Sequence, residues 1–122
     1  MANPAKRKGT AWETAITNAL KARRRFSHAA RVAQTGRWDQ GDIHAWPFVI
    51  QAKAVRKFDL AGWVKDVAEQ RAHAGFPHGV VFVKKYGRPL DEGYAVMSIG
   101  SYMELMDAVA DTYLPTNKPG GA

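Results

Sequence analysis

Two polar residues, Gln51 and Lys53, stand in the middle of an apolar strand pattern, FVIQAKAV at residues 48–55. Side chains alternate between the two faces of a strand, so these two share a face. A lysine among apolar side chains costs free energy unless it pairs with an opposite charge or reaches solvent. The pair therefore requires either a structural or a chemical explanation.

An aspartate faces this pair if residues 41–46 and 48–55 form a hairpin that turns at Trp46 and Pro47. Antiparallel pairing about that turn places Asp42 opposite Gln51. Directly opposed Cβ atoms lie about 5 Å apart and diagonal neighbours about 7–8 Å apart. The spacing therefore predicts that Asp42, Gln51 and Lys53 form one polar cluster on an otherwise apolar sheet.

The cluster has two interpretations. In the structural one, the hairpin lies at a sheet edge, and Lys53 reaches water while it pairs with Asp42. In the functional one, the cluster is a phosphodiesterase site that holds Mg²⁺, which accepts one or two carboxylates together with waters and phosphate oxygens. Asp42, the side-chain carbonyl of Gln51 and the main-chain carbonyl of Ala52 are the candidate ligands. Lys53 would orient or deprotonate the attacking water, or neutralise charge that builds on the phosphate.

Glu13 is the further carboxylate that would complete such a site, provided that the first helix packs against the sheet. Its alternative role is local. The segment TAWE at 10–13 has the pattern of a capping box, in which Glu13 accepts a hydrogen bond from the backbone N–H of Thr10. From the residues alone, the cap is the preferred interpretation.

Apolar periodicity and turn residues predict the elements that must position these side chains. Helices are expected over 10–24, 59–73 and 101–113, with Asp59 near the N-cap of the second and Gly75 beyond its end. Strands are expected over 27–34, 41–46, 48–55, 80–86 and 94–99. The order αβββαββα predicts an α/β fold with a central sheet flanked by helices.

The same periodicity predicts which helical residues are buried. They are Trp12, Ala15, Ile16, Ala19 and Leu20 in the first helix, Leu60, Trp63, Val64 and Val67 in the second, and Tyr102, Leu105, Met106 and Val109 in the third.

A chain of 122 residues, 46% of them apolar, is expected to fold as a single domain. We assign that domain to residues 10–114, with a flexible basic arm over 1–9 and a loose tail over 115–122. The absence of cysteine excludes disulfides and thiolate zinc sites and favours a reducing, cytoplasmic setting. No apolar run approaches the ~18 residues of a membrane span.

The charge of the chain is +7 and is unevenly distributed. Residues 1–57 hold 12 basic and 3 acidic residues, whereas residues 58–122 hold 6 and 8. A basic surface favours a polyanion because neutralised phosphates release counterions; a solvated basic surface is the alternative. The candidate DNA-backbone contacts are Lys6, Arg7, Lys8, Arg23, Arg24, Arg25, Arg56 and Lys57.

Aromatic and amide side chains near the hairpin have possible secondary roles. Trp38 and Trp46 are candidates for stacking on unpaired bases, because every base offers a π-face. His44 shares the face of Asp42 and is a candidate neighbour of the site. Gln70 is a candidate to line the site, although an exposed helix glutamine is the preferred interpretation.

Four short motifs in a fixed order carry a resemblance to a known family. KGTAWE at 8–13, GDI at 41–43 and QAK at 51–53, followed by a helix ending in EQ at 69–70, resemble the PD-(D/E)xK nuclease superfamily. Within it, the chain is similar to the archaeal-type Holliday junction resolvases and their small phage-encoded relatives. The resemblance covers roughly residues 6–100 and implies a restriction-endonuclease-like core.

The resemblance also implies roles for individual residues. The helix-borne acid of the family corresponds to Glu13, its metal-binding aspartate to Asp42, its second acidic ligand to Gln51 and its catalytic lysine to Lys53. The resolvases have glutamate in place of Gln51, and the Q-x-K variant resembles type IV restriction endonucleases that recognise modified DNA. The missing negative charge implies weaker metal affinity.

The implied activity is Mg²⁺-dependent hydrolysis of DNA, with Mn²⁺ as a substitute and a 5′-phosphate product. A resolvase would act as a homodimer that cuts a four-way junction symmetrically, in the host cytoplasm if it is phage-encoded. Two alternatives remain open: a restriction-like or nicking endonuclease on the same scaffold, and a non-catalytic DNA-binding module with a decayed site.

Overall fold

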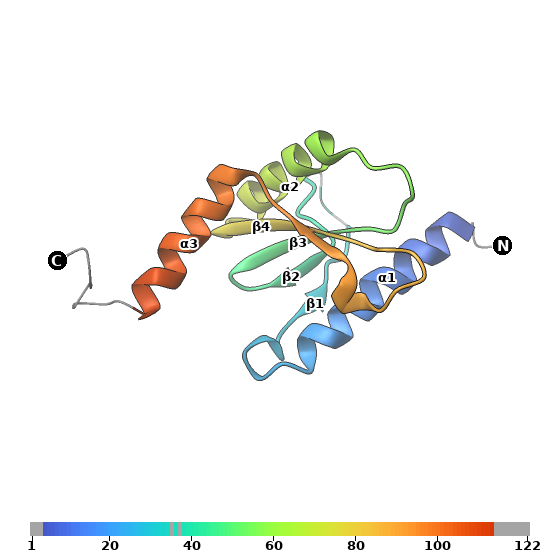
Figure 1. Ribbon diagram of the computed structural model, residues 1–122, viewed down its shortest axis with the longest axis horizontal. Coiled ribbons are helices and arrows are strands. Elements are labelled where there is room, and N and C mark those ends of the chain that lie inside the picture. The colour runs from blue at the N-terminus through green and yellow to red at the C-terminus, as the bar shows by residue number, and fades with distance from the viewer. Residues whose placement is uncertain (1–3, 35, 37, 114–122) are drawn as a thin grey trace.

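The fold is an α/β structure built on one five-stranded mixed sheet (Figure 1). The structure is a computed structural model that describes residues 4–34, 36 and 38–113, with side chains from residue 6 onward. The strands run in the order β1-β2-β3-β4-β5, and only β3 and β4 are parallel. Their bounds are β1 Ala30–Arg31, β2 Ile43–Ala45, β3 Phe48–Lys53, β4 His78–Val83 and β5 Tyr94–Val96. The α/β class and the expected order of elements are confirmed.

The β2–β3 hairpin has the predicted register. Ile43 pairs with Ile50, and the chain turns at Trp46 and Pro47, which are joined by a cis peptide bond. Strand β3 is the third of five, so both of its edges are occupied by neighbouring strands. The structural interpretation that placed Lys53 in a hairpin at the sheet edge is therefore wrong.

Helix α1 spans Pro4–Lys21 and begins well before the expected start at Thr10. Proline suits the first turn of a helix, where its missing N–H is not needed. Thr10 is thus inside the helix, the predicted capping box is wrong, and Glu13 has no N-cap to serve. Residues 4–9, expected in a flexible arm, form the first turns of α1, and residues 1–3 lie outside the described residues.

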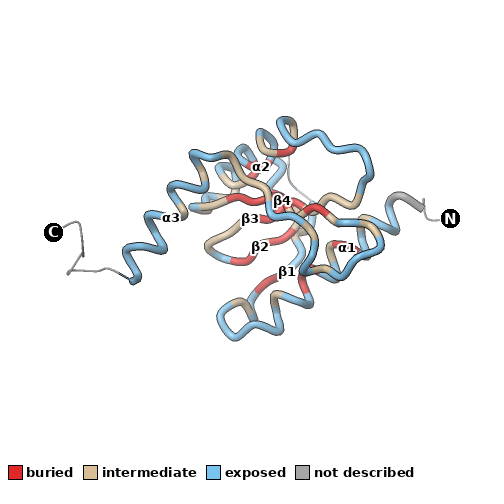
Figure 2. The backbone as a smooth tube through the Cα atoms, in the orientation of Figure 1, coloured by how far each residue is buried: buried red, intermediate tan, exposed pale blue. Residues whose placement is uncertain are grey.

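Two helices cover opposite faces of the sheet. From α1, Trp12 and Ile16 pack with Ile43 and Ile50, and Trp12 Nε1 donates a hydrogen bond to the carbonyl of Phe82 at 3.0 Å. The buried residues concentrate in β2–β4 and the helix faces against them (Figure 2).

Helix α2 spans Leu60–Ala74, connects the parallel strands β3 and β4, and packs Trp63 and Val67 on Val81 and Val83. Both predicted caps are confirmed. The carboxylate of Asp59 accepts a hydrogen bond from the N–H of Gly62 at 3.1 Å, and Gly75 ends the helix in the left-handed conformation.

The third helix, α3 Ile99–Tyr113, contradicts its predicted burial. No residue of α3 is buried: Tyr102, Met106 and Val109 are exposed, and Leu105 is half-buried. The helix follows the short strand β5 and projects away from the sheet (Figure 1). Its periodicity correctly predicted a helix, but no other described residue of the chain buries the apolar face of this helix.

Smaller differences from the expected elements follow from local geometry. Residues 24–26 form a short 3₁₀ helix, η1, and leave only Ala30 and Arg31 to β1 of the expected strand over 27–34. A second 3₁₀ helix, η2, spans Leu90–Glu92. The residues expected to be buried but exposed in α1 and α2 are Ala15, Ala19 and Leu60. Among the described helices, none is long and apolar enough to cross a membrane.

Candidate active site

The β2–β3 hairpin carries Asp42 to the strand end where Gln51 and Lys53 lie. The backbone N–H of Asp42 donates to the carbonyl of Ile50 at 3.1 Å, which extends the β2–β3 ladder by one residue. Its side-chain Oδ2 accepts a hydrogen bond from the N–H of Ala52 at 2.9 Å. The predicted proximity of Asp42 to this end of β3 is thus present, and a backbone donor fixes the carboxylate.

A tight passage at Gly41 delivers Asp42 to this position. Gly41 has a φ of 93°, a conformation that favours glycine. A Cβ atom built there would overlap the Cγ1 atom of Val49 on the neighbouring strand. The glycine of the GDI motif is therefore required by both backbone conformation and space.

Gln51 is buried with an unsatisfied acceptor. The residue is 6% exposed, and among the described residues no group donates a hydrogen bond to its Oε1. A buried polar atom without a partner costs about 1–3 kcal/mol, so most such atoms are satisfied. A carbonyl oxygen that receives no hydrogen bond from an N–H or O–H group has its lone pairs free to coordinate a cation such as Mg²⁺.

Gln70 on α2 is also buried, which corrects the expectation that it is exposed. Its Nε2 donates to Oδ2 of Asp39 at 2.9 Å, and its Oε1, like that of Gln51, has no partner in the described part of the chain. Asp39 in turn accepts a hydrogen bond from the N–H of Gly41. Gln70 and Asp39 therefore brace the loop that presents Asp42.

Glu13 approaches the cluster from α1 and forms an ion pair with Arg31. Oε1 of Glu13 lies 3.2 Å from the Arg31 guanidinium. Burial raises the pKa of Glu13, and the negative charge of Asp42 raises it further, while Arg31 lowers it. The effect of Asp42 on this pKa shows that the two carboxylates lie close enough to interact.

The pKa of Asp42 is likewise raised, chiefly by burial. The hydrogen bond from Ala52, the Lys53 ammonium and Arg31 lower this pKa, whereas the Asp39 carboxylate raises it. The net direction means that the folded chain disfavours the charged form of Asp42. A bound divalent cation would supply the positive charge that these carboxylates lack.

Lys53 lies half-buried on the same strand, and no carboxylate in the described part of the chain forms an ion pair with it. Its Nζ is 5.8 Å from the centroid of the Trp63 ring, and none of the ion pairs of the described residues includes Lys53. The lysine nevertheless lowers the pKa of Asp42 through its charge. It therefore places an ammonium near the carboxylate and leaves that ammonium open to a third, anionic group.

A cluster of three or more His, Cys, Asp or Glu side chains that could hold a metal is not found among the described residues. The third oxygen ligand that the sequence offers is the amide of Gln51, which lies outside those residue types. Its unpartnered oxygen, together with Asp42 and Glu13, fits a hard cation such as Mg²⁺ that keeps several waters. The Ala52 N–H binds Asp42, and the proposed role of the Ala52 carbonyl as a ligand stays a prediction.

The structure divides the other predicted residues between two regions. Lys8 and Arg56 lie around Tyr86, near the end of β3 that carries Lys53. Arg23, Arg24 and Arg25 lie just after the C-terminal end of α1, whereas Lys8 lies near its N-terminal end. The three arginines are therefore far from Glu13 along the helix axis. Lys6, Arg7 and Lys57 are exposed.

Trp46 is not part of the site. It lies at the hairpin turn, at the opposite end of β3 from Lys53, and packs on Phe76 with ring centroids 4.9 Å apart. His44 also contacts Phe76 and binds the carbonyl of Gln40. Trp38 is exposed beside His73 and next to Asp39.

Three residues near the site were not among the candidates predicted from the sequence: Arg31, Asp39 and Lys84. Arg31 pairs with Ile43, the residue after Asp42, in the β1–β2 ladder and forms its ion pair with Glu13 on α1. That pairing depends on the register of β1, which no local pattern in the sequence specifies. Lys84 donates its N–H to the carbonyl of Lys53, and the expected strand over 80–86 was the available signal.

Comparison with protein-family models, with curated proteins and with solved structures finds no match. The residues of the site and their arrangement are therefore what indicates a function.

Replacing Gln51 by glutamate tests whether its carbonyl faces a cation. We expect Gln51→Glu to bind Mg²⁺ about tenfold more tightly or better, because ligand charge sets affinity at such sites, and to unfold at a lower temperature in EDTA. Calorimetric titration and thermal unfolding measure the two effects. Gln51→Leu is the matched control: it should lose affinity without losing stability in EDTA. Equal Mg²⁺ affinity in all three proteins would show that residue 51 does not face the ion.

Proposed function

We propose that the chain is a divalent-cation-dependent DNA endonuclease on a restriction-endonuclease-like core. The substrate we favour is a four-way DNA junction, cut symmetrically by a homodimer. One observation carries the proposal: a buried glutamine oxygen, without a hydrogen-bond partner among the described residues, lies on the strand that also bears Lys53. Asp42, at the same end of this strand, and Glu13 on α1 both have raised pKa values. Three of the four motifs that resemble the nuclease superfamily, KGTAWE, GDI and QAK, supply these side chains.

The residues of the chain have separable roles in this reaction. Asp42, Glu13 and the Gln51 carbonyl would hold the cation, which when bound supplies a Lewis acid and lowers the pKa of a bound water. Lys53 contributes a fixed positive charge where negative charge builds on the phosphate. Trp63 covers the lysine on one side and restricts the directions from which a phosphate can approach.

A basic cluster beside the site supports a path for the DNA backbone. Lys8, Arg56 and Lys84 lie 5.9, 4.4 and 5.3 Å from the centroid of the Tyr86 ring. The Tyr86 hydroxyl donates to the carbonyl of Ala54 at 2.7 Å and so fixes the ring next to β3. None of the three cations forms an ion pair with a described carboxylate. Three like charges around one ring favour an anion such as a DNA phosphate.

We expect Arg56→Ala and Lys84→Ala each to reduce the slope of log K against log salt by about 1, because each loses one phosphate contact. Binding of a fluorescent four-way junction at several salt concentrations measures the slope. Lys65→Ala, which removes an exposed lysine from α2, is the matched control and should leave the slope unchanged. The same loss in all three variants would contradict a localised phosphate contact.

Cleavage of a labelled four-way junction and a matched linear duplex, with Mg²⁺ or EDTA, tests the proposed function. The expected result is paired Mg²⁺-dependent cuts at the junction, absent in EDTA, lost in Asp42→Ala and strongly reduced in Lys53→Ala. Equal cutting of the duplex would replace the resolvase with a restriction-like or nicking enzyme. Junction binding without cleavage under Mg²⁺ or Mn²⁺ would overturn the nuclease and leave a DNA-binding module.

A further inference from the structure

Arg31 is held beside both carboxylates of the candidate site. Its Nε and Nη2 atoms each lie 3.2 Å from Oε1 of Glu13. Arg31 pairs with Ile43 in the β1–β2 ladder, and the N–H of the next residue, Val32, donates to the carbonyl of Asp42 at 2.9 Å. Burial raises the pKa of both carboxyls, and Arg31 is the one cation of the described residues whose charge lowers both. The same guanidinium therefore acts on both carboxylates that we assign to the cation.

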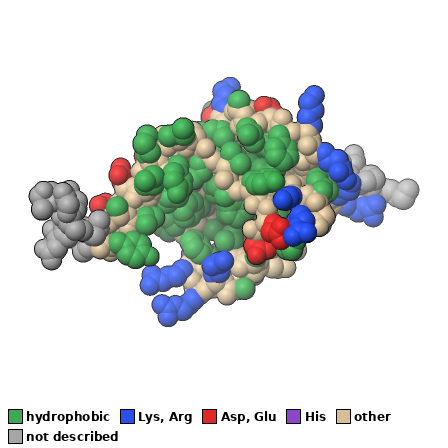
Figure 3. Space-filling view, in the orientation of Figure 1, with side chains coloured by type: hydrophobic (Ala, Val, Ile, Leu, Met, Phe, Trp, Pro, Cys, Tyr) green, Lys and Arg blue, Asp and Glu red, His purple; other side chains and the backbone are tan. Residues whose placement is uncertain are grey.

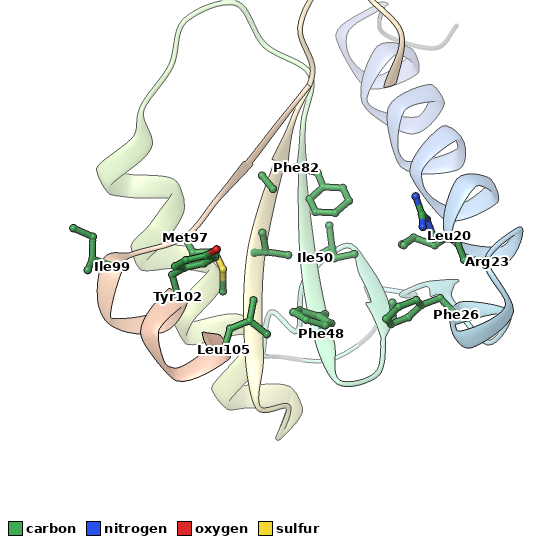
Figure 4. A pocket seen from close by; sticks show the side chains of 13 residues that line it. Leu20, Arg23, Phe26, Phe48, Ile50, Phe82, Met97, Ile99, Tyr102 and Leu105 are labelled. Atoms are coloured by element: carbon green, nitrogen blue, oxygen red, sulfur yellow. The ribbon is translucent and has the colours of Figure 1, made fainter. Parts of the chain in front are cut away.

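Other arginines of the chain have different surroundings. On the face shown in Figure 3, hydrophobic side chains fill the centre, and Lys and Arg side chains project around it. Arg23 lies on the wall of a cavity of about 650 Å³, where it is the only charged lining residue (Figure 4). Arg88 forms an ion pair with Glu92 at 2.8 Å in the connection between β4 and β5. Among the ion pairs of the described residues, that of Arg31 is the one that involves a candidate cation ligand.

The ion pair between Arg31 and Glu13 can open at little cost. The side chain of Arg31 is 45% exposed and that of Glu13 is 24% exposed. An ion pair that is so open to water contributes little to the stability of a fold. The β1–β2 ladder fixes the backbone of Arg31, so only its side chain has to move when the pair opens. The guanidinium is thus free to exchange Glu13 for another anion nearby.

A divalent cation on Glu13 and Asp42 would change the balance of charge around Arg31. When both carboxyls are ionised, their two negative charges are matched by Arg31 and Lys53, and a divalent ion adds an excess of two positive charges. Like charges that share a ligand in a partly buried site repel one another. The ion also binds the carboxylate oxygen more closely, at about 2.0–2.1 Å for Mg²⁺ against 3.2 Å for Arg31. Arg31 is therefore the weaker partner of Glu13.

We propose that Arg31 competes with the cation for Glu13, and that its guanidinium, once it leaves this carboxylate, binds a phosphate of the DNA backbone. The planar donor fork of arginine matches phosphate oxygens, and its strand keeps the guanidinium next to the site. Binding of the cation and binding of DNA are then coupled, because each favours the position of Arg31 that the other requires. The inference rests on the proposed cation site and adds a residue that no step of the proposed reaction uses.

Calorimetric titration with Mg²⁺, without DNA, tests the competition. We expect Arg31→Gln to bind Mg²⁺ about fivefold more tightly than the native chain, the upper end of the effect of an exposed ion pair. Arg88→Gln removes an ion pair of the same kind in the β4–β5 connection and is the matched control, expected to keep the native affinity. Arg31 is half exposed, so its variant should keep the fold, as circular dichroism will verify. Equal Mg²⁺ affinity in all three proteins would overturn the inference.

Binding of a fluorescent four-way junction in EDTA and in Ca²⁺ distinguishes this role from a permanent phosphate contact. Ca²⁺ is a hard cation with oxygen ligands, as Mg²⁺ is, and affinities are measured before any cleavage, as gel electrophoresis verifies. We expect Arg31→Gln to match the native affinity in EDTA and to bind about fivefold more weakly than the native chain in Ca²⁺. An equal loss in both conditions would overturn the competition and make Arg31 a constant backbone contact. No loss in Ca²⁺ would overturn the coupling to DNA.

The Nε–H group of Arg31 reports the exchange in the native chain by nitrogen NMR, with Arg31→Lys to identify its signal. We expect this N–H to be protected from exchange with water in EDTA by its hydrogen bond to Glu13, and to lose that protection as Mg²⁺ is added. A signal that saturating Mg²⁺ leaves unchanged would overturn the inference and leave the cation site in place. Absence of Mg²⁺ binding in the native chain and in every variant would overturn both, whereas absence of cleavage alone would overturn only the nuclease.

Discussion

Asp42→Asn is expected to abolish Mg²⁺-dependent cleavage and, at the same time, to raise the melting temperature in EDTA. Asparagine retains an oxygen that can accept the hydrogen bond from Ala52 but removes the charge that would hold the cation. Loss of the ion should reduce the rate by at least about 10³-fold, the scale of a lost electrostatic contribution of about 4 kcal/mol.

The gain in stability follows from the raised pKa of Asp42. A carboxyl whose pKa is higher in the folded than in the unfolded state binds its proton more tightly in the folded state. The free energy of unfolding is then highest below the ordinary carboxyl pKa and falls as pH rises through the window up to the folded pKa. At neutral pH the buried, charged carboxylate of Asp42 lowers the free energy of unfolding of the native chain. The uncharged side chain of Asp42→Asn does not have this effect.

Thermal unfolding in EDTA between pH 4 and pH 8 measures this effect, with about 1 kcal/mol corresponding to a shift of several degrees. Asp111→Asn is the matched control, because Asp111 is exposed on α3, and it should unfold at the native temperature across the range. Adding Mg²⁺ should raise the melting temperature of the native chain and leave Asp42→Asn unchanged. An Asp42→Asn protein that is less stable than the native chain in EDTA would contradict the electrostatic account.

Lys53→Ala is expected to lower the cleavage rate by about 10²–10³-fold, the cost of removing one charge-stabilising group from a transition state. Binding of the cation should persist, because the ligands are oxygen atoms of other residues. The pKa of Asp42 should rise further, since Lys53 lowers it in the native chain. The pH dependence of any residual cleavage should therefore move to higher pH.

Single-turnover cleavage with saturating enzyme separates this loss from weaker DNA binding. Lys53→Arg keeps the positive charge but carries it on a planar guanidinium group. This variant should therefore retain more activity than Lys53→Ala. Lys65→Ala, on the exposed side of α2, should cleave at the native rate. If Lys53→Ala lost only junction affinity and cut at the native rate under saturation, the lysine would be a backbone contact and not a catalytic residue.

Local rules predicted the parts of this chain in which neighbouring residues decide the conformation. The hairpin register follows from the turn at Trp46 and Pro47 together with strand alternation, and Asp42 therefore reaches Gln51 as predicted. The caps of α2 follow from Asp59 and Gly75. The start of α1 was wrong because a capping-box pattern at Thr10 is only a local preference, and the helix continues through it to Pro4.

The contacts around the candidate site could be identified only from the tertiary structure. The pairing of Arg31 with Glu13 joins β1 to α1, and the burial of Gln70 depends on where α2 crosses the sheet. Each is a contact between segments far apart in the sequence, whose geometry no local pattern specifies.

The sequence by itself determined the α/β class, the order of the elements and the polar group of Asp42, Gln51 and Lys53, because periodicity and turn residues act over a few positions. Only the tertiary structure decided that β3 is central, that the Gln51 oxygen is buried with no hydrogen-bond donor among residues 4–34, 36 and 38–113, and that the apolar face of α3 is exposed there. Helical periodicity reports that a face is apolar, but what covers that face is set by packing between distant segments.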